Sequence, residues 1–109
     1  NRRVEIRYAG ADANPYLACA ALLAAGLEGI DKGLALEPEQ QGDSHRAEGI
    51  REIPGSLRAA AERARDSAML RRAFGEEVVE HYLHNAAWEI AETDRVVTDY
   101  ELQRLLERA

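Results

Sequence analysis

The sequence has few of the residues that usually hold a small domain together. It contains one cysteine, Cys19, in 109 residues, so the chain cannot form an internal disulfide, which fits a reducing compartment. Aromatic residues make up only 6% of the chain, although 46% of it is hydrophobic. Much of that hydrophobic share is alanine. A core of Ala and Leu is typical of packed helices, because helix faces rather than large rings must then supply the buried surface.

An excess of basic residues and a long apolar run are also missing. The formal net charge is −6, and an acidic chain has no broad attraction for nucleic acid or anionic membranes, so neither is expected as a partner. The most apolar run, 15–27, is too short and too rich in alanine to span a membrane. No signal peptide is apparent at the N-terminus. We therefore expect a cytoplasmic protein.

A strand is predicted at the start of the chain, over residues 3–8. Apolar and charged residues alternate there, with Val4, Ile6 and Tyr8 on one face and Arg3, Glu5 and Arg7 on the other. This period of two is that of a half-buried strand. No second strand is evident, so its pairing partners must lie outside this sequence. A strand that begins at the first residue, without an initiator Met, suggests that the chain is cut from a longer protein.

Helical patterns account for most of the remaining residues. Asn14 before Pro15 is a strong start signal, because Asn caps the first turn and Pro fits the first helical position. Thr98 and Glu101 have the spacing of a capping box. Helices are predicted over about 15–32, 56–66, 68–74, 76–93 and 98–108, with a long loop over 34–54. The expected fold class is α+β but mainly α, with one N-terminal strand followed by four to five helices.

The charged face of the predicted strand is the sharpest candidate site. Arg3, Glu5 and Arg7 would lie about 6.5–7 Å apart along the strand. A carboxylate between two guanidinium groups can bind a divalent cation while the arginines bind phosphate oxygens. The same alternation is also typical of an exposed strand whose charges neutralise one another. The pentapeptide alone favours the second interpretation, because such alternation is common.

Other polar residues have simpler explanations. His81 and His84 share one predicted helix and could approach a metal, but no third ligand has a fitting spacing, so a solvated helix face is favoured. Cys19 is expected to be a buried small hydrophobe rather than a nucleophile. His45 is expected to be a surface histidine, and Trp88 to serve in packing. A solvated helix face is also expected for the charged run Arg63, Arg65, Asp66, Arg71 and Arg72.

The order of these motifs resembles the C-terminal part of bacterial-type glutamine synthetases. The resemblance begins with the Arg-x-Glu-x-Arg pattern at 3–7, passes through a small-residue loop to Asn-Pro-Tyr-Leu at 14–17, and includes an Ala/Leu helix ending in Gly-Leu-Glu-Gly-Ile. Later it covers GEEVVEHYL at 75–83, Trp-Glu at 88–89 and Val-Thr-Asp-Tyr-Glu at 97–101. It extends over essentially the whole chain, and its first 30 residues are the most specific part.

The resemblance implies the C-terminal portion, residues 1–109, of the catalytic domain of an oligomeric ligase. Such enzymes join the γ-carboxyl of glutamate to ammonia or an amine through γ-glutamyl phosphate, with ATP as a substrate and Mg²⁺ or Mn²⁺ as the metal. Glu5 would then be a metal ligand, Arg7 would contact the substrate carboxylate or the phosphoryl group, and Arg3 would lie beside the nucleotide phosphates. The family's other metal carboxylates, nucleotide pocket and ammonia-site loop lie upstream and have no counterpart here. We therefore expect this chain to be inactive alone.

The chain also departs from some family members. A regulatory tyrosine of the long loop is missing, since the loop reads Gly-Asp-Ser-His at 42–45. This loop and the helix EHYLHNAAWE at 80–89 favour relatives that use amines such as polyamines. The alternative function is a non-catalytic helical interaction or oligomerisation module, because an unpaired strand and an Ala/Leu helix both expose surfaces that need cover.

Overall fold

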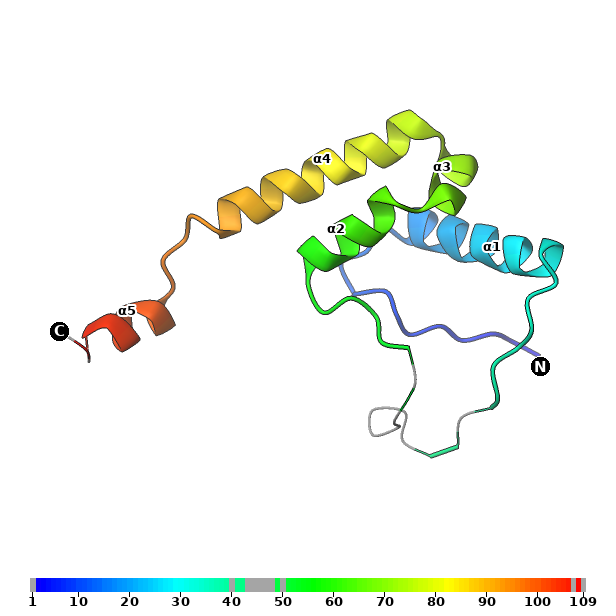
Figure 1. Cartoon of the computed structure of the whole chain (residues 1–109), viewed down its shortest axis with the longest axis horizontal. Coiled ribbons are helices and arrows are strands. Elements are labelled where there is room, and N and C mark those ends of the chain that lie inside the picture. The colour runs from blue at the N-terminus through cyan, green and yellow to red at the C-terminus, as the bar shows by residue number, and fades with distance from the viewer. Residues whose placement is uncertain (1, 40, 43–48, 50, 107, 109) are drawn as a thin grey trace.

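The described part of the chain is mainly helical. The structure, a computed structural model, describes residues 2–39, 41–42, 49, 51–106 and 108. These residues contain five α-helices (Figure 1), which are α1 (Pro15–Asp31), α2 (Leu57–Arg65), α3 (Ala68–Phe74), α4 (Glu76–Thr93) and α5 (Asp99–Leu106). Their bounds differ from the ranges predicted from sequence by at most two residues. Between α1 and α2, the described residues contain no helix or strand.

The strand predicted over residues 3–8 is not found in the described chain. Residues 2–8 run as an extended segment without a β-ladder, and they donate no backbone hydrogen bond to another described segment. A strand persists only when a neighbouring strand pairs with its N–H and C=O groups. Nor is one face half-buried, because Val4 is 88% exposed and Tyr8 is 73% exposed. The predicted α+β class with an N-terminal strand is therefore wrong for this structure, whose described regular elements are all helical.

Three of the helices start at side-chain caps that can be read from the sequence. The Oδ1 atom of Asn14 accepts hydrogen bonds from the backbone N–H groups of Tyr16 at 3.0 Å and Leu17 at 3.3 Å. Ser56 and Ser67 cap α2 and α3 in the same way, each accepting from the N–H three residues later at 3.2 Å. Each cap satisfies N–H groups that the first helical turn leaves without partners, so the helix starts are encoded locally.

Helix α5 begins with the predicted capping box. The backbone N–H of Thr98 donates to Glu101 Oε2 at 2.8 Å, and the N–H of Glu101 donates back to Thr98 Oγ1 at 3.2 Å. The hydrogen bonds from Thr98 hold the pKa of Glu101 below its ordinary value. The helix lies at the far end of α4, away from the others (Figure 1), and its apolar residues stay exposed. Local chemistry therefore sets the start of α5 without help from packing.

The core is thin and lies along α4, where α2 packs against it. Val79 and Leu83 of α4 are its buried members, at 6% and 7% exposure. The facing side of α2 is rich in alanine, which lets the two helices approach closely. Arg58 at the start of α2 pairs with Asp94, just beyond the end of α4, at 2.6 Å. The two helices therefore run antiparallel.

The chain leaves far more surface exposed than a self-contained domain does. Its accessible area is 10287 Å², whereas a compact monomer of 12.1 kDa exposes roughly 6,000 Å². Its radius of gyration is 18.3 Å, compared with about 13 Å for a compact domain of this length. The excess, roughly 4,000 Å², is as large as an obligate subunit interface. The chain therefore has the surface of a segment that packs against further protein.

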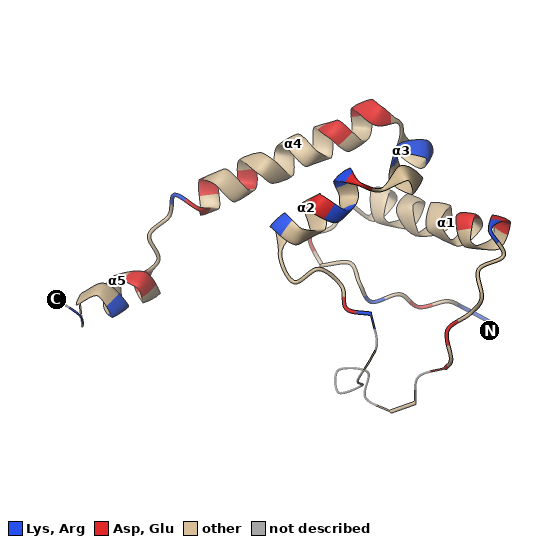
Figure 2. Cartoon of the chain, viewed as in Figure 1, with Lys and Arg blue, Asp and Glu red and all other residues tan. Residues whose placement is uncertain are grey.

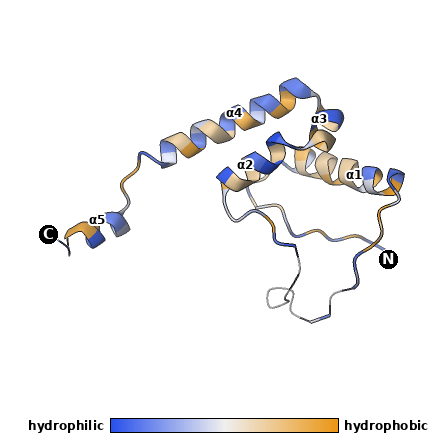
Figure 3. Ribbon diagram, in the orientation of Figure 1, coloured by the Kyte–Doolittle hydropathy of each residue, from blue (hydrophilic) through white to orange (hydrophobic). Residues whose placement is uncertain are grey.

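Helix α1 carries much of this uncovered apolar surface. Figure 2 shows charge on α1 only near its C-terminal end, and Figure 3 shows that the rest of the helix is apolar. None of its residues is buried, although a helix that is apolar on all sides is normally covered on all sides. Across the described residues, no helix combines the length and the hydropathy that a bilayer crossing requires.

Candidate functional site

The structure brings together two of the three predicted site residues. The Nε atom of Arg7 donates to Glu5 Oε1 at 2.8 Å, and its Nη2 atom lies 2.7 Å from the same oxygen. The pair is exposed to solvent, by 86% for the Arg7 side chain and 54% for the Glu5 side chain. Arg3 is also exposed and forms no ion pair with another described residue. An exposed pair of this kind is weak, so both groups are available to other partners.

The described chain does not build a metal site around these residues. No group of three or more His, Cys, Asp or Glu side chains in the described ranges could hold a metal ion. A divalent cation such as Mg²⁺ takes about six oxygen ligands. The exposed carboxylate of Glu5 is a suitable oxygen ligand for such a cation, and arginines suit phosphate oxygens. Glu5 can supply one ligand side chain, and the others would have to come from outside this chain.

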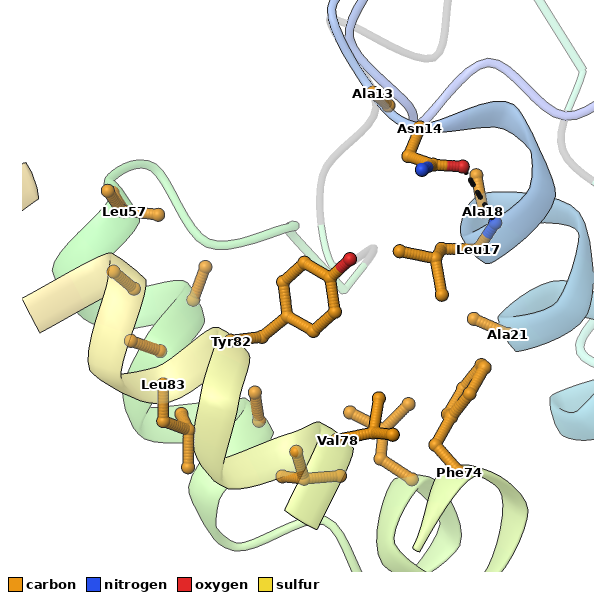
Figure 4. A pocket seen from close by; sticks show the side chains of 16 residues that line it. Ala13, Asn14, Leu17, Ala18, Ala21, Leu57, Phe74, Val78, Tyr82 and Leu83 are labelled. Atoms are coloured by element: carbon orange, nitrogen blue, oxygen red, sulfur yellow. Dashed lines mark hydrogen bonds between the residues drawn. The ribbon is translucent and has the colours of Figure 1, made fainter. Parts of the chain in front are cut away.

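An apolar groove of about 460 Å³ lies between α1 and the helices α2, α3 and α4 (Figure 4). Apart from Asn14, its walls are aliphatic or aromatic, and no charged residue lines it. Figure 4 shows Tyr82 of α4 extending towards Asn14 and Leu17 at the start of α1, while the Oδ1 atom of Asn14 is engaged in the helix cap. The groove lacks cations for phosphate, and Arg3, Glu5 and Arg7 do not line it. It is suited to apolar contact rather than to a charged substrate.

Arg71, predicted to lie on a solvated helix face, is instead the centre of a polar cluster. Its side chain is 25% exposed and pairs with Glu76 and, at 2.8 Å, with Glu80. It also donates to the backbone carbonyl of Arg65 at the end of α2, at 3.2 and 3.3 Å. The hydrogen bonds to Glu76 and Glu80 raise the pKa of Arg71. One side chain thus ties α2, α3 and α4 together and is less solvated than predicted. The rest of the predicted charged run is exposed as expected, namely Arg63, Arg65, Asp66 and Arg72.

Arg72 forms a second tie, which joins α3 to α1. Its Nη2 atom lies 2.6 Å from Glu28 Oε2, although the two residues are 44 positions apart in the sequence. The other carboxylate oxygen of Glu28 accepts from Lys32. These hydrogen bonds, first that of Lys32 and then that of Arg72, hold the pKa of Glu28 below its ordinary value. The Glu28 side chain is 21% exposed and the Arg72 side chain is 59% exposed, so the carboxylate is the partly buried member of the pair at the contact between α1 and α3.

The remaining predicted residues have mixed outcomes. His81 and His84 are exposed on α4, as a solvated face requires, and His81 Nε2 lies 3.2 Å from Asn85 Nδ2. Cys19 is exposed, so its predicted burial is wrong for this structure. Trp88 is 58% exposed, so its predicted packing is not found in the described chain either. Both lie on helices whose outer faces have no cover here. The loop residues Asp43, Ser44 and His45 lie outside the described residues.

The sequence matches part of a known catalytic domain. Residues 1–105 match the family model described as glutamine synthetase, catalytic domain. The chain belongs to this family, and the resemblance seen in its motifs is confirmed.

Several relatives have been assigned individual activities. The chain is 45% identical over 106 residues to the gamma-glutamylethanolamide synthetase GlnA4 of Streptomyces coelicolor, covering 97% of this chain and 23% of the relative. It is 40% identical over 113 aligned positions to the glutamine synthetase of Mycolicibacterium smegmatis, covering 97% and 25%. It is 41% identical over 107 residues to the glutamate–isopropylamine ligase of a Pseudomonas species, covering 96% and 23%. The chain thus spans about a quarter of the length of these relatives.

Proposed function

We propose that this chain is the C-terminal part of the catalytic domain of a longer cytoplasmic ligase, which joins the γ-carboxyl of glutamate to ammonia or an amine. The family match over residues 1–105 carries the proposal. The names of the relatives support an acceptor that is ammonia or a small amine, because two of them name the products glutamine and γ-glutamylethanolamide and one names isopropylamine as the amine that is joined to glutamate. In this proposal ATP is the second substrate and γ-glutamyl phosphate is the intermediate.

The three exposed residues near the N-terminus would act on the transferred phosphoryl group. Phosphoryl transfer depends chiefly on positioning and on neutralising negative charge. Glu5 would hold Mg²⁺ or Mn²⁺, which neutralises phosphate oxygens when bound. Arg7 would leave its exposed pair with Glu5 and donate to the phosphoryl group or the substrate carboxylate. Arg3 would donate to the nucleotide phosphates.

The same proposal makes residues 1–109 inactive alone. Three observations support this, namely the excess exposed surface, the lack of a three-ligand metal group in the described chain, and the charge-free groove. The partners of the chain would then be the remainder of the ligase and neighbouring subunits of a homo-oligomer. Together these would supply the other metal ligands and the substrate pockets.

The test is an assay of phosphate release that depends on both glutamate and an amine. We expect activity from the intact ligase and none from residues 1–109 alone. Glu5→Ala in the intact ligase should lower kcat by about 100-fold or more, because metal-assisted charge neutralisation is lost. The matched control is Glu37→Ala, which removes an exposed carboxylate from the segment after α1. A near-normal rate for Glu5→Ala would reject the metal role, and turnover by the isolated chain would reject the dependence on the remainder.

A non-catalytic interaction module is the second candidate function. The uncovered apolar residues of α1 and α5 favour it, because such surfaces mark contacts with other proteins. Sedimentation of residues 1–109 distinguishes the two candidates when it is combined with the activity assay. Specific self-association by a protein whose intact form has no ligase activity would support the module, whereas a compact, non-associating monomer would count against it.

A further inference from the structure

Glu28 occupies an unusual place on α1. The helix has no charged residue from 15 to 27, and Glu28 is the first, near the C-terminal end. One of its oxygens accepts from Lys32 and the other from Arg72 Nη2 at 2.6 Å. Among the described ion pairs, this is the one that joins α1 to the other helices. We call Glu28 and Arg72 the clasp.

The clasp fixes the rotation and register of α1, which the apolar contact of this helix does not fix. The side of α1 that lines the groove presents Leu17, Ala18 and Ala21, and such small apolar side chains allow a helix to rotate or slide at little cost. A buried or half-buried polar pair can specify one register, because the wrong register leaves its charges without partners. The Glu28 side chain is 21% exposed and the Arg72 side chain is 59% exposed, so the clasp is half-buried on its Glu28 side, whereas both members of the Glu5–Arg7 pair are open.

A small tilt of α1 at the clasp would move the opposite end of the helix, which lies nearer to the candidate site in the sequence. Helix α1 has 17 residues and is therefore about 25 Å long. A tilt of about 10° at the clasp would move the opposite end by roughly 4 Å, given that length. The opposite end is Asn14, and Arg7 and Glu5 precede it by seven and nine residues, with a turn at residues 11–12 between them and the helix. A misplacement of about 1 Å can cost a reaction about 100-fold, so the site tolerates far less movement than this.

We propose that Glu28 and Arg72 are positioning residues, which lock α1 onto α3 and thereby hold the Arg3–Glu5–Arg7 segment where phosphoryl transfer requires it. The proposal rests on the proposed ligase function. Neither residue touches the reacting atoms. Their effect passes through the rigid helix α1 and its capped N-terminus.

The test uses the intact ligase with Glu28→Gln, Arg72→Met, the double variant and the conservative Arg72→Lys. The matched control is Arg58→Met, which breaks the 2.6 Å pair with Asp94 and leaves α1 untouched. Hydrogen exchange over residues 15–31 reports on α1, and steady-state kinetics separate kcat from KM. Glu28→Gln keeps the shape of the side chain, and circular dichroism checks that every variant is folded.

We expect each single variant to speed exchange in α1 about three- to fivefold, as loss of one partly exposed pair implies. We expect kcat to fall about tenfold with little change in KM, because the reacting groups are misplaced rather than removed. The double variant should be no worse than the singles, and Arg72→Lys should recover most of the rate. The control should change neither measurement.

Two results overturn the proposal in different ways. If the wild-type ligase is active, an unchanged kcat in the clasp variants would refute the positioning role alone. An equal fall of kcat in the control Arg58→Met would refute it as well. Absence of ligase activity in the wild-type protein would refute the proposed function, and the positioning role with it.

Discussion

Leu83 is one of the two buried residues of the thin helical core. Its side chain is 7% exposed and lines both the apolar groove and a second hollow between α2 and α4. The side chain therefore forms part of the wall of both spaces, and Leu83→Ala would enlarge both. Leu→Ala changes in cores cost about 2–5 kcal/mol, more when the cavity that remains is larger. Because this groove is open to solvent on one side, we expect the lower part of that range, about 2–3 kcal/mol.

Such a loss would be large for this chain. It buries roughly 40% of the surface that its unfolded form exposes, well below the fraction for a compact domain of its size. Urea unfolding of residues 1–109, followed by circular dichroism at helix wavelengths, measures the change in the free energy of unfolding. The matched control is Leu106→Ala, since Leu106 is 77% exposed and its truncation should cost less than about 0.5 kcal/mol. A cost below about 1 kcal/mol for Leu83→Ala, or equal costs for both variants, would refute this account of the core.

Three further predictions concern individual helices. The pKa of Glu28 is held below its ordinary value, so the contribution of Glu28 to the α1–α3 contact is complete above the ordinary carboxyl pKa. This contribution is lost as the pH falls through the lowered pKa. Helicity measured against pH should therefore fall in acid, and Arg72→Met should make that fall smaller. Thr98→Ala removes the capping box and should weaken α5 by about 1 kcal/mol, seen as faster amide exchange over 99–106, and unchanged exchange would contradict it. Gly75 joins α3 to α4 at φ 83° and ψ 159°, a backbone conformation that residues with a Cβ rarely adopt. Gly75→Ala should therefore destabilise the junction by about 1–3 kcal/mol in urea unfolding, even though an added Cβ would meet no atom within 4 Å, and a neutral effect would show that the backbone relaxes.

The helices could be predicted from sequence because their signals are local. Asn14 and Ser67 precede apolar periodic segments, and the hydrogen bonds that they make lie within three residues. The Thr98–Glu101 box is equally short in range. A cap of this kind satisfies the first turn whatever the rest of the protein does. The predicted bounds are therefore close to the observed ones for these helices.

The predictions of the strand, of the burial of Cys19 and of the packing of Trp88 are wrong for a common reason. Alternation at 3–8 shows which side chains would share a face, but a ladder also needs backbone partners, and none lies in the described chain. The outer faces that carry Cys19 and Trp88 likewise have no cover here. Sequence periodicity reports the capacity for burial, whereas burial itself depends on what lies opposite.

The two arginine ties could not be read from sequence spacing either. Arg71 reaches Glu80 and the carbonyl of Arg65 only after the turn between α3 and α4 has folded. Arg72 meets Glu28 across 44 residues, and no local pattern marks such a pair. For the candidate site, the sequence names Arg3, Glu5 and Arg7, and the structure shows them exposed. The roles assigned to them remain proposals.

The uncharged stretch of α1 has a practical consequence for any cell or laboratory that produces this piece separately. A helix that carries no charge over most of its length and that is not covered by other residues presents an exposed apolar surface, which favours aggregation and binding by chaperones. Charged substitutions on its outward side, for example at Leu23, which is 64% exposed, should keep the piece dispersed at higher concentration. In the proposed ligase, the same substitutions would obstruct assembly with the rest of the enzyme. The yield of residues 1–109 would therefore rise while the yield of the assembled enzyme would fall.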